Sequence, residues 1–419
     1  MSNYEGTLST VTHAIHSKKA APTQVPGRRA WVMLIVATIG FAVSFWAWAL
    51  LSPLGPKFAD VLHLSSLNQS LVVAVPVIVG SLGRIPAGAL TDRFGGRIMF
   101  PIVCLVTIAP VLYLGLSGHS SLAGLLVGGF FLGIGGTSFA VGVPFVNAWF
   151  PPEKRGLAIG IFGMGMGGTA ISALTTVKLV TAHGTATPFI ITAIVLAVYS
   201  VIAYLVLRNP PGRPAPSGTM MGRLAETVKL KVTWQAAALY AVAFGGYVAF
   251  SVYLPTDLKT AYHLGQGDAS NRMAGFVLLA VLMRPVGGWV ADRIGPARVV
   301  AVTLAVAIAG AIIESFTPSL NPLGTIAFLI MAAALGAGSG AVFSLVAKLA
   351  PVSAVGSVTG VVGAAGGLGG FIPPLIMGYV YGQFHEYRIG LIALAVVAAA
   401  ALVLTLTAVR AGLRALQRL

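Results

Sequence analysis

Two arginines stand alone in long apolar stretches of the sequence, and each is followed eight residues later by an aspartate. Arg84 precedes Asp92, and Arg284 precedes Asp292. Eight residues of helix rise by about 12 Å, so each arginine falls near the middle of an apolar layer about 30 Å thick. A guanidinium presents parallel N–H donors in one plane and suits planar oxyanions. The chemistry indicated is the binding of a flat anion away from bulk water.

The sequence offers these arginines no carboxylate partner. An arginine in a hydrocarbon layer costs at least about 2.5–3.5 kcal/mol. The ten acidic residues lie outside the expected helices or near their ends, and the seven histidines lie in tails and loops. We therefore expect the counter-ion to come from outside, from the class that includes nitrate, nitrite, formate and other carboxylates. The alternative is that each arginine bonds backbone carbonyls or hydroxyls within its own group of helices.

The composition requires a lipid environment for the helices that carry the arginines. Hydrophobic residues make up 57% of the 419 residues and charged residues 9%, with a mean hydropathy of +0.91. Such a chain is too apolar for a soluble globule. The single cysteine, Cys104, excludes a disulfide within the chain and a cysteine-rich metal site. No nucleophile–base pair or metal cluster is visible, so we expect neither an enzyme nor a cofactor.

Twelve apolar runs are long enough to cross a bilayer, which predicts an all-α membrane protein. They fall six and six around a polar, proline-rich connection. The predicted divisions are a cytosolic tail over 1–29, a six-helix bundle over 30–207, a cytosolic linker over 208–232, a second bundle over 233–409 and a cytosolic tail over 410–419. The runs cover residues 30–52, 68–90, 98–117, 121–147, 156–178, 186–207, 233–256, 271–291, 298–316, 322–347, 355–381 and 388–409.

The distribution of Lys and Arg predicts which way the chain crosses the membrane. If both termini are cytosolic, 19 basic residues lie in cytosolic segments and 5 in the opposite loops. This bias is typical of an inner or plasma membrane protein that obeys the positive-inside rule. The formal charge of +16 is then explained by anchoring beside anionic lipid, and we expect no nucleic-acid partner.

The two halves contain an internal repeat at an offset of 200 residues. GRIPAGALTDRFG, from Gly83, matches MRPVGGWVADRIG, from Met283, and places Arg84 on Arg284. In the same register, GLAIGIFGMGMGG from Gly156 matches GSVTGVVGAAGGL from Gly356. Two motifs in one register indicate duplicated six-helix halves with a substrate site between them near the bilayer midplane.

The GxLxDRxG pattern from Gly88 resembles the signature of the major facilitator superfamily. The resemblance implies two pseudo-symmetric bundles, a monomer, and a cytosolic gate held by charges after the second helix of each half. The alternative is that these charges are solvated loop residues. The residues concerned are Asp92, Arg93, Arg97, Asp292, Arg293 and Arg298.

Two glycine-rich stretches, GIFGMGMGG from Gly160 and GAAGGLGGFIPP from Gly363, resemble those of the nitrate/nitrite porter family. The resemblance implies that Arg84 and Arg284 clamp the substrate, that Tyr240 is a donor and that Phe139 and Phe244 are aromatic walls. Closely spaced glycines also let helices approach a ligand or each other, and close packing alone is the alternative. The glycines concerned are Gly163, Gly167, Gly363 and Gly367.

The sequence departs from that family where asparagines are common. Met166 and Gly167 stand in the fifth helix, and Thr137 and Ser138 in the fourth. The expected function is nitrate and nitrite transport, with a small monocarboxylate or oxalate/formate-type exchanger as the alternative. An empty site would hold a charge of about +2, which is costly to enclose. We therefore expect anion exchange, because the acids and histidines lie outside the predicted helices or near their ends and none is expected to be embedded in the membrane to relay a proton. Proton symport stays open.

Overall fold

The computed structural model describes residues 27–210, 220–350 and 355–417. The predicted N-terminal tail up to residue 26 and the middle of the linker lie outside these ranges. The side chain of Asp92 also lies outside the description.

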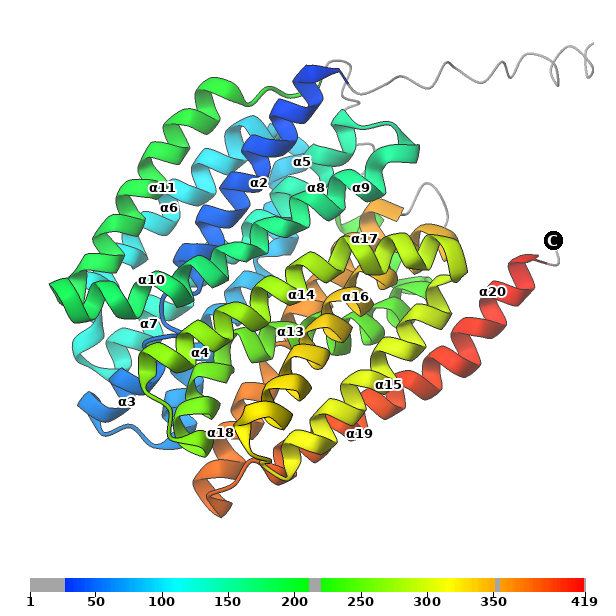
Figure 1. Cartoon of the computed structure of the whole chain (residues 1–419). Helices are drawn as coiled ribbons and strands as arrows, with labels where there is room; N and C mark the ends of the chain where they lie inside the picture. The colour runs from blue at the N-terminus through cyan, green and yellow to red at the C-terminus, as the bar shows by residue number, and fades with distance from the viewer. Residues whose placement is uncertain (1–26, 211–219, 351–354, 418–419) are drawn as a thin grey trace, which may run out of the picture.

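The first half consists of apolar helices that run back and forth across one bundle (Figure 1). A short helix, α3, follows the first crossing and lies at the end of the bundle away from the start of α2. The helices are α2 (Arg28–Trp48), α3 (Gly55–Leu62), α4 (Ser66–Leu82), α5 (Arg84–Phe94), α6 (Gly96–Leu116), α7 (Leu122–Leu132), α8 (Ser138–Trp149), α9 (Pro152–Gly163), α10 (Gly168–His183) and α11 (Ala186–Val206).

The second half forms a second bundle beside the first (Figure 1). Its helices are α12 (Met220–Lys229), α13 (Lys231–Tyr262), α14 (Gln266–Ile294), α15 (Pro296–Ser315), α16 (Thr325–Leu349), α17 (Val355–Gly369), α18 (Ile372–Phe384), α19 (Arg388–Leu404) and α20 (Arg410–Gln417). Within the described ranges, 12 helical stretches are long and apolar enough to cross a membrane. The predicted all-α fold with twelve spans is confirmed.

The two halves differ most at the level of the arginines. In the first half, two crossings tighten into short 3-10 turns, η2 (Gly133–Thr137) between α7 and α8, and η3 (Met164–Gly167) between α9 and α10. In the second half, the corresponding residues at the 200-residue offset lie within α16 and α17, which continue through this level as single helices. The repeat is therefore approximate, and the breaks in the first half leave backbone groups free to bond side chains.

Small residues set the close packing of the second bundle. An added Cβ at Gly287 would lie 2.1 Å from the Ala337 carbonyl oxygen, and one at Gly340 would lie 2.0 Å from the Arg284 carbonyl oxygen. Lipid gives helices no hydrophobic reason to associate, so backbone contact of this kind holds membrane bundles together. The glycines thereby fix α16 against α14, the helix that carries Arg284.

Hydrogen bonds join the two bundles at the end of the molecule that holds α3, which we call the α3 end. The Ser52 hydroxyl donates to the carbonyls of Ser251, at 3.1 Å, and Val252, at 2.8 Å. The Gln69 amide donates to Thr256 Oγ1 at 3.1 Å, and Lys259 pairs with Asp60. These contacts close the α3 end.

Candidate functional site

Arg84 is the first residue of α5 in the second crossing, just after α4 ends at Leu82. Its side chain is 7% exposed. Nη1 donates to the Gly363 carbonyl at 2.6 Å, and Nε donates to the Gly136 carbonyl at 3.5 Å. Gly136 belongs to η2 of the same bundle, whereas Gly363 belongs to α17 of the other. The stronger bond of Arg84 therefore crosses between the bundles.

Arg284 reaches across the interface in the opposite direction. It is also 7% exposed, and Nη1 lies 2.9 Å from the Met166 sulfur in η3 of the first bundle. Nη2 donates to the Tyr240 hydroxyl at 3.0 Å. A Cβ added at Gly163 would lie 3.8 Å from Arg284 Cζ. The repeat is thus visible in the contacts, since Arg84 meets position 363 and Arg284 meets position 163.

Aromatic rings line the space around both guanidinium groups. The Arg84 Cζ lies 5.1 Å from the Phe139 ring centroid and 5.9 Å from that of Phe244, and the Arg284 Cζ lies 5.0 Å from the same Phe244 ring. Tyr240 stacks on Phe244 at 4.7 Å with an interplanar angle of 3°. The structure therefore brings together the five side chains predicted to form the site.

The two guanidinium charges lie close enough to repel each other, and no acid within the described residues pairs with them. The ion pairs found in the described parts of the chain, Lys259–Asp60 and Arg272–Asp268, do not involve either arginine. The arginines do not follow the alternative of bonding only within their own bundles, because each has its shortest contact in the other bundle. Carbonyl, hydroxyl and thioether groups are weaker partners for a guanidinium than an anion is.

The cavity beside Arg84 is small. It has a volume of ≈ 10 Å³, and its lining includes Phe45, Trp48, Ser81 and Gly367. That space holds about one water. An anion of several atoms would therefore have to displace side chains that now touch the arginines.

The four predicted glycines do not share one environment. A Cβ at Gly363 would lie 3.4 Å from the Phe139 ring, and one at Gly367 would lie 2.1 Å from Ser81 Oγ and 3.4 Å from Arg84 Nη1. Gly163 lies beside Arg284, as described above. At Gly167, a Cβ would meet nothing within 4 Å. Three of the four therefore contact the arginine site or its lining, and Gly167 faces open space.

The predicted gate residues lie at the opposite end of the spans from the α3 end. The Arg97 Cζ lies 5.3 Å from the Tyr204 ring centroid, and the Arg293 Cζ lies 3.8 Å from the Trp289 ring centroid. The Arg93 Cζ lies 5.2 Å from the ring centroid of its neighbour Phe94, and Arg298 donates to the Ile294 carbonyl at 3.4 Å, four residues earlier. Asp292 is exposed. A gating role for these residues stays a prediction.

Sequence reasoning missed several partners in the site. The arginines bond the Gly136 and Gly363 carbonyls and the Met166 sulfur, and periodicity carries no signal for such contacts.

The premise that no acidic side chain is embedded in the membrane was wrong. Asp257 and Glu314, 7% and 2% exposed, are buried within the spans Lys231–Tyr262 and Pro296–Ser315. Asp257 was misplaced because α13 continues six residues beyond its predicted end at residue 256.

Comparison with known proteins identifies the family of the chain. The sequence model of the Major Facilitator Superfamily matches residues 37–266 and 236–417. The probable nitrate/nitrite transporter NarK2 of Mycobacterium tuberculosis is 47% identical over 384 residues, which cover 90% of this chain and 96% of that protein. The nitrite extrusion protein of Bacillus subtilis is 37% identical over 378 residues, covering 90% and 94%.

A solved structure shares the fold. The crystal structure of a bacterial homologue of the human lysosomal transporter Spinster, in an inward-facing and occupied conformation, has a TM-score of 0.72. It is 18% identical in sequence and covers 92% of this chain and 98% of that chain.

Two adjoining bundles with twelve spans, together with these matches, define a multi-pass transporter of the plasma membrane, and the chain belongs to the major facilitator superfamily. Within the superfamily it belongs to the nitrate/nitrite porter family, as the glycine-rich stretches predicted. The fold and the relatives are those of transporters, not of enzymes.

Proposed function

We propose that this protein carries nitrate and nitrite across the membrane by alternating access, holding one anion between Arg84 and Arg284. The observation that carries the proposal is the pair of buried guanidinium groups, one from each bundle, which face one aromatic ring and have no carboxylate partner among the described residues. The relatives named as nitrate or nitrite transporters support the same substrate class.

The geometry favours a small planar anion. Each arginine has N–H groups bonded to weak or neutral acceptors, the Met166 sulfur and the Gly363 carbonyl. Oxygens of a flat oxyanion can replace both acceptors and take two coplanar N–H bonds from a guanidinium. The faces of Phe139 and Phe244 can then flank the anion, while the Tyr240 hydroxyl accepts from Arg284 Nη2 and donates its own proton to the anion.

Charge supports exchange in preference to one-way transport. The site without an anion holds a charge of about +2, and enclosing it away from water removes the hydration of both charges without supplying a counter-ion, which is energetically costly. One bound anion lowers the charge to about +1 and supplies acceptors. The loaded site therefore closes more readily than the empty one, which favours trading nitrate for nitrite across the membrane.

Sidedness follows from the distribution of basic residues. With both termini cytosolic, as that distribution supports, the α3 end faces outward, and its cross-bundle bonds describe a carrier closed to the outside. The charges Asp92, Arg93, Arg97, Asp292, Arg293 and Arg298 then lie on the cytosolic side, where they act on the cytosolic gate.

Binding competition on the purified protein tests the substrate. Calorimetric titration of nitrate in the presence of increasing formate should leave nitrate as the tighter ligand. Tighter binding of formate would instead identify the protein as a small monocarboxylate exchanger.

Counterflow in liposomes tests the mode of transport, since nitrate uptake should require nitrite or nitrate inside. Uptake that is undiminished without internal anion would reject exchange.

A further inference from the structure

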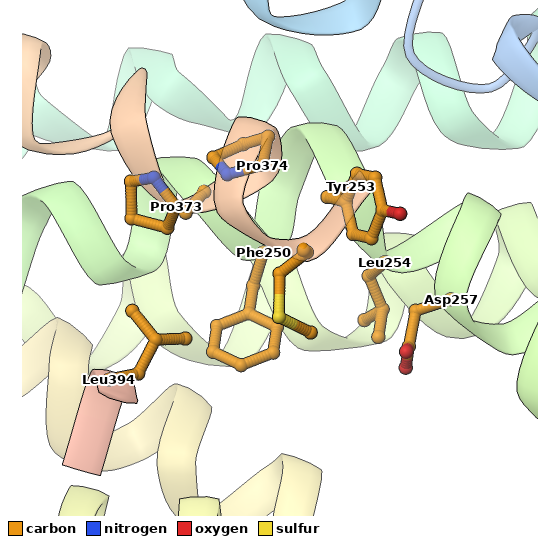
Figure 2. A pocket seen from close by; sticks show the side chains of 9 residues that line it. Phe250, Tyr253, Leu254, Asp257, Pro373, Pro374 and Leu394 are labelled. Atoms are coloured by element: carbon orange, nitrogen blue, oxygen red, sulfur yellow. The ribbon is translucent and has the colours of Figure 1, made fainter. Parts of the chain in front are cut away.

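A buried carboxylate lies in the second bundle, far from the arginines. Asp257 is 7% exposed and belongs to α13, thirteen residues after Phe244, or about 20 Å along the helix. Figure 2 shows it at the rim of a cavity whose lining includes Tyr253, Pro374 and Met377. Within the described residues, its oxygens have no hydrogen-bond or ion-pair partner. One helix therefore joins the anion site to an unpartnered acid.

A second acid lies near the first. Glu314, in the last turn of α15, is 2% exposed. The Tyr262 hydroxyl donates to its Oε2 at 2.8 Å, while its Oε1 is buried with no partner among the described residues. The Glu314 and Asp257 carboxyl groups are close enough for their charges to repel.

In the part of the chain that the structure describes, no cation pairs with these acids. Apart from each other, the titratable side chains that interact with the two acids come from α13 and from the residue before α19, and all are phenols. They are Tyr253, Tyr262 and Tyr387. Burial raises the pKa of the Tyr387 hydroxyl above its ordinary range, so it remains a neutral donor or acceptor.

The basic side chains of this region have other partners. Lys259 pairs with Asp60, and Arg272 pairs with Asp268. The Arg388 Cζ lies 4.9 Å from the Phe316 ring centroid. Among the residues described, the two buried acids thus have no basic partner.

The chemistry of the site points to a proton as its ligand. An ionised carboxylate buried without a cation is costly, and a second like charge nearby adds to the cost. A bound proton removes both costs. The cavity beside Asp257 has a volume of ≈ 20 Å³, room for about one water and too little for an organic ligand. The described residues contain no group of three or more metal-ligating side chains.

The acid site lies among the contacts that close the α3 end. On α13, Thr256 and Lys259 flank Asp257 and bond Gln69 and Asp60 of the other bundle. The carbonyls of Ser251 and Val252, one to two turns earlier, accept from Ser52. Separation of the bundles at this end would break these contacts and admit water to Asp257. Closure would bury it again.

We propose that Asp257 and Glu314 form a proton-binding site that must be filled before the α3 end can close. An anion bound at the arginines and a proton bound at this site would then act on the same helix, α13, from its middle and from its end. The proton serves as a second ligand of the closed form.

Infrared spectroscopy of the purified full-length protein tests the site without any anion. The wild type should show the carbonyl band of a protonated carboxylic acid at neutral pH, and Asp257→Asn and Glu314→Gln should each remove part of it. Asp268→Asn is the matched control, because its side chain is 52% exposed and paired with Arg272. Absence of the band from the wild type, or an unchanged band in both variants, would overturn the proposal.

A transport measurement tests the consequence and rests on the proposed function. Nitrate exchange in liposomes should slow as the outside pH rises, by up to about tenfold per pH unit above the midpoint of proton loss. The double variant Asp257→Asn/Glu314→Gln should lose that dependence, and Asp268→Asn should keep it. A double variant with the wild-type pH profile would overturn the proposal. Failure of every form to exchange nitrate would overturn the proposed function alone, since the infrared bands decide the proton site separately.

Discussion

Arg284 donates an N–H to the sulfur of Met166 at 2.9 Å, across the interface between the two bundles. A thioether is a weak acceptor, so this bond is a poor match for a buried guanidinium. An anion oxygen is a far stronger acceptor. Met166 therefore holds Arg284 in position while leaving the N–H available to a better partner.

Replacing Met166 by asparagine should tighten nitrate binding. An amide at this position can donate to an anion oxygen, and one such hydrogen bond contributes about 1 kcal/mol, or about fivefold in affinity. Calorimetric titration of nitrate into the purified variant measures the change. Met164→Asn is the control on the same turn, because Met164 is exposed and should leave affinity unchanged. Weaker binding by Met166→Asn would contradict the assigned role of the sulfur.

Replacing either arginine by lysine should abolish most transport. Lysine keeps the charge but loses the planar pair of donors, and we expect Arg84→Lys and Arg284→Lys to lower counterflow at least about a hundredfold, a loss of about 2.7 kcal/mol. Each variant should still insert and purify as a single species. Arg272→Lys, on the surface beside Asp268, should transport normally. Near-normal counterflow by both site variants would refute the clamp.

Tyr240→Phe isolates the contribution of one hydroxyl. The ring should stay stacked on Phe244, while the bond from Arg284 Nη2 to the hydroxyl is lost. Hydrogen bonds to charged groups contribute about 1.5–3 kcal/mol, so nitrate affinity should fall by at least about tenfold. Tyr379→Phe is the control, because that side chain is exposed on α18. Equal affinities of the two variants would show that the hydroxyl does not act through Arg284.

The arginine pair could be predicted from sequence because two regularities acted together. The 200-residue repeat matched Arg84 with Arg284, and the spacing to each loop aspartate gave the depth. Burial and the shared Phe244 ring agree with that inference. Lipid makes such reasoning dependable, because a charge in an apolar span must find a polar partner inside the protein or in a ligand.

The partners of the arginines could not be predicted in the same way. The Gly136 carbonyl is available because the fourth crossing tightens at η2, a local break that hydropathy does not encode. Asp257 was placed in a loop because a polar residue near a helix end looks the same whether α13 stops before it or continues to Tyr262. The packing of α18 and α19 around it decides its burial, and that information is not local in sequence.

Gly340→Ala should destabilise the protein and weaken anion binding together. A Cβ there would lie 2.0 Å from the Arg284 carbonyl oxygen, so α16 and α14 must move apart at the level of the site. Overpacking of this kind costs about 1–3 kcal/mol, and the shift also displaces the guanidinium. Thermal unfolding in detergent and nitrate titration measure the two effects.

The matched control for Gly340→Ala is Gly275→Ala, on the same helix as Arg284. A Cβ at Gly275 would meet nothing within 4 Å, and alanine favours a helix interior over glycine by about 0.5–1 kcal/mol. This variant should therefore be as stable as the wild type or slightly more stable, with unchanged nitrate affinity. If Gly340→Ala lowered stability but left affinity intact, the contact between α14 and α16 would support the bundle without positioning Arg284.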